Sequence, residues 1–69
     1  MPYASLEDLP ASVADHLPIH AQEIYRAAFN NAWMNYAERG EAREEIAHRV
    51  AWAAVKHRYR KEGDRWIPS

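Results

Sequence analysis

The 69-residue sequence contains no cysteine, only two glycines and no long run of apolar residues. The absence of cysteine excludes a disulfide framework and a cysteine-ligated zinc site. Two glycines are too few for a glycine-rich loop that binds phosphate. The apolar runs fall far short of the roughly 20 residues that cross a bilayer, so we expect no membrane insertion.

The length predicts one small domain over residues 1–69, a size at which a single core supplies only modest stability. Three Trp, four Tyr and one Phe must therefore pack densely. The opening Met1-Pro2-Tyr3 lacks the basic and apolar regions of a secretory signal. We expect a cytoplasmic protein.

Charge is distributed unevenly along the chain. Residues 1–45 hold three Lys and Arg against eight Asp and Glu, whereas residues 46–69 hold six against two. The two parts carry −5 and +4, although the net charge is only −1. Either acidic helices lie against a basic one, which we favour, or the basic part offers a face to an acidic partner.

Proline positions divide the first third of the chain. Pro10 suits a first helical turn, and Pro18 ends the short helix that follows. One apolar stripe runs along this segment, formed by Leu6, Leu9, Val13 and Leu17. A second helix is predicted from about Ile19 to Arg39, where Gly40 ends it.

Helical periodicity assigns a core face to the second helix. This face contains Ala21, Ile24, Tyr25, Ala28, Phe29, Ala32, Trp33 and Tyr36. Asn30 and Met34 lie on the other half, and we expect them to face solvent. A third helix is predicted from near Glu41 to about Lys61, with acidic residues first and basic residues last, as the helix dipole favours.

The chain ends in Arg65-Trp66-Ile67, a short extended segment after Gly63. This segment and the N-terminal segment around Tyr3 can pair into a small sheet. The predicted fold class is therefore mainly α, with one short and two long helices and a small β-sheet formed by the N- and C-terminal segments.

The third helix carries two apolar edges. An arc that can meet the second helix contains Ile46, Ala47, Val50, Ala51, Ala53 and Ala54. A second edge contains His48, Trp52, Val55 and Tyr59. This second edge is either core, covered by the short helix or by Trp66, which we favour, or an exposed aromatic patch flanked by cations. The candidate interaction surface consists of Arg49, Trp52, Lys56, Tyr59, Arg60 and Lys61.

Metal binding and catalysis find no support in the sequence. His16 and His20 are four residues apart, but Pro18 between them interrupts the helix that would align their imidazoles. His48 and His57 are nine residues apart, on opposite sides of a helix. No serine has the setting of a nucleophile elbow. We predict a non-enzymatic protein without a cofactor.

The sequence resembles the ChaB family along nearly all of its length. The similar stretches are MPY at the start, Leu9-Pro10, LPIHAQEIYRAAFNNAW over residues 17–33, AHRVAWAAVKHRY over residues 47–59, and Trp66. The resemblance implies a compact helical fold with a small sheet and a role in regulating cation transport, since the family is named for association with a sodium/calcium-proton antiporter. It implies no catalytic residue. Residues 37–43 are shorter than the charged insertion expected of the family.

Two functions remain open. The resemblance favours a regulatory or adaptor protein that contacts a protein partner, such as a cation antiporter or an associated component. The alternative is a nucleic-acid-binding module that uses the basic C-terminal helix, with Trp52 or Tyr59 available for stacking. The near-zero net charge disfavours this alternative.

Overall fold

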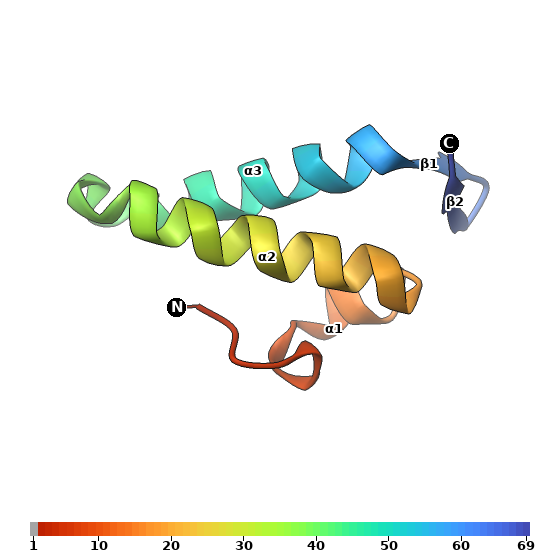
Figure 1. The fold of residues 1–69 in the computed structure, drawn as a ribbon, viewed down its shortest axis with the longest axis horizontal. Coiled ribbons are helices and arrows are strands. Elements are labelled where there is room, and N and C mark those ends of the chain that lie inside the picture. The colour runs from red at the N-terminus through yellow and green to blue at the C-terminus, as the bar shows by residue number, and fades with distance from the viewer. Residues whose placement is uncertain (1) are drawn as a thin grey trace.

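The computed structural model describes residues 2–69. It contains α1 (Ala11–Ala14), α2 (Ile19–Asn35), α3 (Ala42–Arg58), β1 (Tyr59–Glu62) and β2 (Arg65–Pro68), with 3₁₀ turns at Leu6–Asp8 and Ala37–Arg39. The long helices α2 and α3 lie side by side, the N-terminal segment and α1 run along α2, and the β-hairpin projects from the end of α3 (Figure 1). The predicted class, mainly α with one short and two long helices and a small sheet, is confirmed.

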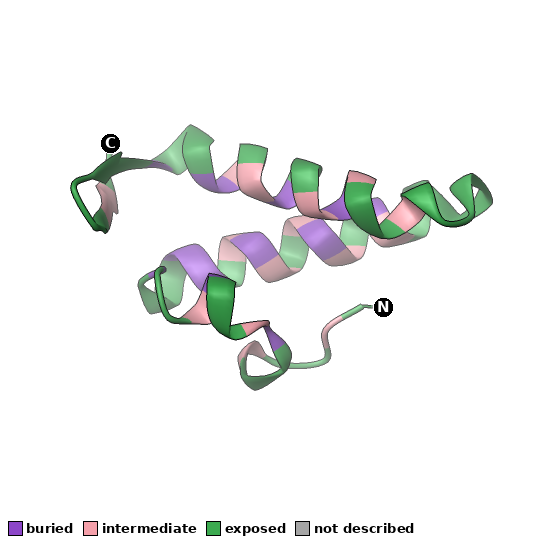
Figure 2. Cartoon of the chain, turned by 180° about the vertical axis from the view of Figure 1, so that it is seen from behind, coloured by how far each residue is buried: buried purple, intermediate pink, exposed green. Residues whose placement is uncertain are grey.

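The core forms where α2 and α3 face each other (Figure 2). The buried residues of α2 are Ala21, Gln22, Tyr25, Phe29 and Ala32, and those of α3 are Ala47, Ala51 and Val55. Alanines at the contact let the two backbones approach closely, which gives the aromatic rings a tight fit. The predicted core face of α2 is therefore confirmed, except that Tyr36 is exposed beyond the helix end.

The predicted apolar stripe of the first third packs against the same core. Leu9, Val13 and Leu17 are buried, and Leu6 is partly buried. Gln22 is buried as well, although its amide is polar. Its Nε2 donates hydrogen bonds to the carbonyl oxygens of Ala14 at 3.1 Å and Leu17 at 2.8 Å, so it satisfies the end of α1.

The position of Asn30 differs from the one that the sequence predicted. It was predicted to face solvent, but its Oδ1 accepts from the Tyr3 backbone N–H at 2.8 Å and its Nδ2 donates to the Tyr3 carbonyl at 2.9 Å. Arg26 Nε donates to the same carbonyl at 2.8 Å. Periodicity identifies the two faces of a helix but not an extended segment that covers the polar one. Met34 is exposed as expected.

The partner strand in the sheet was predicted wrongly. The N-terminal segment around Tyr3 forms no strand, and the sheet pairs β1 with β2, with Tyr59 opposite Pro68 and Lys61 opposite Trp66. Helix α3 therefore stops at Arg58 instead of Lys61. The helix ends early because the two-residue Gly63-Asp64 loop turns the chain back and pairs Tyr59–Glu62 as a strand. Gly63 has a φ of 62°, and a type II′ hairpin turn requires a glycine at this position.

The second helix is also shorter than predicted. Helix α2 ends at Asn35, and the Ala37–Arg39 stretch forms a separate 3₁₀ turn before Gly40. Gly40 has φ 58° and ψ −126°, a conformation that only glycine adopts readily. The chain reverses direction here and starts α3.

Candidate interaction surface at the C-terminal hairpin

Successive side chains of the β-hairpin point to opposite faces of its two strands. Lys61 and Trp66 are directly opposite each other and share one face of the hairpin with Tyr59. Arg60 and Glu62 lie on the other face, where Arg60 Nη2 and Glu62 Oε2 form an ion pair at 3.3 Å. The hairpin thus brings a lysine and an indole to the side of Tyr59, the strand residue that packs in the core.

Trp66 packs on Trp52 of α3, with ring centroids 5.7 Å apart. Trp52 in turn meets Tyr25 of the core edge-to-face at 5.3 Å. Val55 is fully buried and Tyr59 is 6 % exposed. The favoured interpretation of this edge as core is confirmed for Val55 and Tyr59. Trp52 is only half-buried, because Trp66 covers part of it and the rest of both rings is open.

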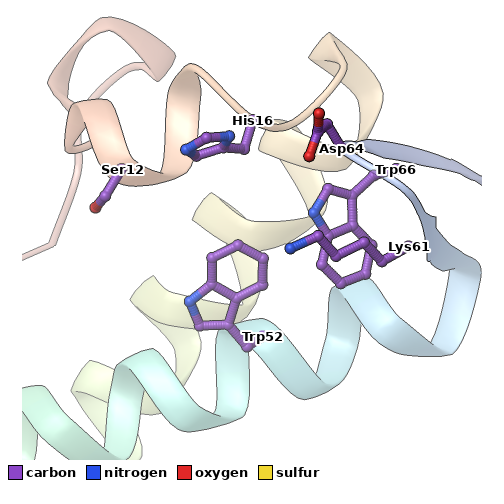
Figure 3. Close-up of a pocket in the computed structure, with 6 residues that line it drawn as sticks. All are labelled: Ser12, His16, Trp52, Lys61, Asp64 and Trp66. Carbon is purple, nitrogen blue, oxygen red and sulfur yellow. The ribbon is translucent and has the colours of Figure 1, made fainter.

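The open side of the two indoles forms a shallow cleft. Four residues line it, namely Trp52, Lys56, Lys61 and Trp66, and it has a volume of about 550 Å³; we call it the indole cleft. An adjoining cavity of about 300 Å³ shares Trp52, Lys61 and Trp66 and adds Ser12, His16 and Asp64 (Figure 3). The cleft therefore has an aromatic floor and two ammonium groups.

The structure divides the six predicted surface residues. It brings Trp52, Lys56 and Lys61 together in the indole cleft. Tyr59 belongs to the core, and its hydroxyl forms a hydrogen bond with Nδ1 of His20 at 3.0 Å. Of the remaining two, Arg49 pairs with Glu45 of its own helix at 3.2 Å, and Arg60 lies on the far face of the hairpin.

Trp66 is the residue that sequence reasoning left out of the surface. The signal for it was the Gly63-Asp64 dipeptide before the extended segment, since a two-residue loop that begins with glycine is typical of a β-hairpin.

The apolar arc of α3 is oriented differently from the prediction. Ala47 and Ala51 meet α2, but Val50 is 36 % exposed and Ala53 is exposed too. These two residues line an open groove of about 510 Å³ with Ile24, Ala54, His57 and Arg58. This orientation of α3 packs one side of the Trp52 ring on Tyr25, which removes more apolar area from water than packing a smaller side chain there would.

Two tyrosine phenols have raised pKa values. Burial raises the pKa of the Tyr25 phenol, and its hydroxyl forms a hydrogen bond with Nδ1 of His48. Burial and the nearby Glu44 raise the pKa of Tyr3. His48 faces the core and His57 lines the opposite groove, as their spacing predicted. Within residues 2–69, no three His, Asp or Glu side chains gather closely enough to hold a metal ion.

The same part of the chain has no helix with the length and apolar character needed to span a membrane. The fold and the surface together define a small helical domain in which a helix pair supports a terminal hairpin and an aromatic, cationic cleft. The ChaB family model matches residues 9–69, and the chain belongs to this family.

Proteins similar to this chain match it over nearly their whole length. "Putative cation transport regulator ChaB" of Escherichia coli K12 is 53 % identical over an alignment 72 positions long, which covers 96 % of this chain and 95 % of that protein. The protein of that name from Shigella flexneri matches equally well. A solution NMR structure of a protein with that name superimposes with a TM-score of 0.86 at 49 % identity, covering 99 % of each chain.

Proposed function

We propose that the chain is a non-enzymatic regulatory protein of the cytoplasm that acts on cation transport by contact with a protein, either a cation antiporter or a component associated with it. The regulatory role is supported by relatives that carry the name of a cation transport regulator and share about half of their residues with this chain. The contact itself is supported by the indole cleft.

The observation that carries the proposal is the composition of this cleft. Two half-buried indoles stand beside Lys56 and Lys61, and neither lysine has a carboxylate within ion-pair distance among residues 2–69. Aromatic side chains and cations at a partly desolvated position are typical of the residues that dominate protein–protein binding energy. If the part of the partner that binds the cleft is accessible in only one conformation of the partner, binding favours that conformation and so changes transport.

Reconstitution tests this function directly. A cation antiporter from the same cell is placed in vesicles, and sodium- or calcium-driven proton exchange is measured as the purified chain is added. We expect the chain to change the exchange rate in a saturable way. Replacing both lysines, Lys56→Gln with Lys61→Gln, should raise the concentration for half-maximal effect about tenfold, because two charge pairs are lost.

The control is a second double variant, Arg49→Gln with Arg58→Gln. It removes the same charge from exposed positions outside the cleft, so it should behave as the unmodified chain does. An exchange rate that stays constant at saturating concentrations of the chain would overturn the proposed function.

A further inference from the structure

The indole cleft is built from two similar pairs of residues. Lys56 follows Trp52 by four residues on α3, which places the two side chains on the same helix face. Lys61 stands opposite Trp66 across the hairpin. Because the two rings are 5.7 Å apart, they form one aromatic surface, and both lysines line the cleft beside it.

This arrangement sets the chemistry of an occupant. An apolar or aromatic side chain is needed to cover the open side of the indoles, and anionic groups next to it are needed to meet the two lysines. We propose that the indole cleft binds a short acidic peptide segment of the partner, in which one large apolar residue lies between carboxylates. This inference rests on the proposed function, since it specifies the segment that the partner supplies.

The surroundings of the cleft limit how far the positive charge extends. Asp64 lies at the adjoining cavity, and the next hollow is lined by Asp15 and Asp64 together with Arg65, so two carboxylates stand against one cation there. On the other face of the hairpin, Arg60 is paired with Glu62. The cationic region is therefore large enough for a few carboxylates. The phosphates of a longer nucleic acid would extend beyond it and lie close to the neighbouring aspartates. The net charge of −1 also opposes binding of a polyanion.

The test uses synthetic peptides and the indole N–H signals of ¹⁵N-labelled protein. The probe is the capped peptide Gly-Asp-Glu-Phe-Glu-Asp-Gly, compared with Gly-Asn-Gln-Phe-Gln-Asn-Gly, which has the same shape without charge, and with Gly-Asp-Glu-Ala-Glu-Asp-Gly, which lacks the ring. We expect the first to shift the Trp52 and Trp66 signals in a saturable way and to bind at least about fivefold more tightly than the other two.

Trp33 provides a control inside the same molecule. It packs under the Arg43 guanidinium, 4.0 Å from the ring centroid. Trp33 belongs to the last turn of α2, and the connection from α2 to α3 that follows lies at the end of the helix pair opposite to the hairpin (Figure 1). The Trp33 indole signal should not move. Equal shifts of all three indole signals would show unspecific binding and overturn the inference.

Two charge-matched variants complete the experiment. Lys56→Gln with Lys61→Gln should weaken binding of the acidic peptide about tenfold, whereas Arg49→Gln with Arg58→Gln should leave it within about twofold. A decrease of the same size in both variants would mean that overall charge, and not the cleft, attracts the peptide. A ten-residue oligothymidine that binds the cleft more tightly than the acidic peptide would replace the inference with the nucleic-acid alternative.

The results separate this inference from the proposed function. An antiporter whose exchange rate responds to the chain through Lys56 and Lys61, together with an acidic peptide that does not bind, would overturn the peptide chemistry alone. Peptide binding at the cleft together with an unresponsive antiporter would keep the cleft as a peptide site and overturn the role in transport.

Discussion

Trp52 serves two purposes at the scale of a single residue, because one side of its ring packs on Tyr25 and the other lines the indole cleft. Trp52→Ala should therefore lower the free energy of unfolding by about 2–3 kcal/mol, less than for a fully buried tryptophan. Urea denaturation followed by circular dichroism measures the change. Met34→Ala, at a position 74 % exposed, is the control and should stay within about 0.5 kcal/mol.

Tyr25 predicts how stability depends on alkaline pH. Burial raises the pKa of its phenol above the ordinary value of 10.0, so the unfolded state loses this proton first as the pH rises. Stability should be constant with respect to this group below about pH 10 and fall above it, by at most about 1.4 kcal/mol per pH unit. Tyr3, whose pKa is also raised, acts in the same direction.

The variant Tyr25→Phe removes the titrating group. Its free energy of unfolding, measured by urea titration between pH 8 and pH 11, should decline less steeply than that of the unmodified chain. Parallel declines in the two proteins would show that the phenol is not shielded from water in the folded state.

At the scale of elements, Gln22 fixes the corner between α1 and α2 by donating to two backbone carbonyls. Gln22→Leu keeps the volume but leaves the Ala14 and Leu17 carbonyls without this donor, which should cost about 1–3 kcal/mol. Asn31→Leu makes a similar change at an exposed position of the same helix and should cost much less. Guanidinium denaturation of both variants distinguishes a buried polar contact from a change in helix propensity.

Gly63 controls the hairpin that carries Trp66. A Cβ at this position meets nothing within 4 Å, so the cost of Gly63→Ala comes from the backbone alone, at φ 62°. We expect the hairpin to lose about 1–2 kcal/mol, with weaker cross-strand contacts between Lys61 and Trp66 in NMR spectra. A synthetic chain with D-alanine at position 63 should keep them. Loss of the contacts in both chains would contradict the turn assignment.

The sequence predicted those features that depend on helical periodicity. The core face of α2 and the stripe of Leu9, Val13 and Leu17 follow from spacing alone. The boundary between α3 and β1 at Tyr59 does not follow from spacing, because Tyr59, Arg60 and Lys61 fit the end of a helix as well as a strand. Only the pairing of these residues with β2 across the Gly63-Asp64 turn decides between them. The indole cleft depends on that pairing, so only part of it could be predicted from the sequence.

At the scale of the whole molecule, the question is whether the acidic and basic parts of the chain hold each other together. The ion pairs described for residues 2–69 are Glu44 with His48, Glu45 with Arg49, and Arg60 with Glu62, and each lies within a single element. None joins α2 to α3, which instead meet through apolar contacts and the hydrogen bond between Tyr25 and His48. The Glu44–His48 and Glu45–Arg49 pairs do connect the acidic part to the basic part, but only within α3, so no ion pair joins separate elements among residues 2–69.

Salt tests this division of roles. Raising sodium chloride from about 0.05 to 0.5 M should change the free energy of unfolding by less than about 1 kcal/mol, because exposed pairs within one element contribute little. Binding of the acidic peptide at the indole cleft should weaken severalfold over the same range, because its carboxylates meet two exposed ammonium groups. A fold that loses stability as steeply as the peptide loses affinity would mean that attraction between the two parts of the chain stabilises the domain, which leaves less of the basic charge for a partner.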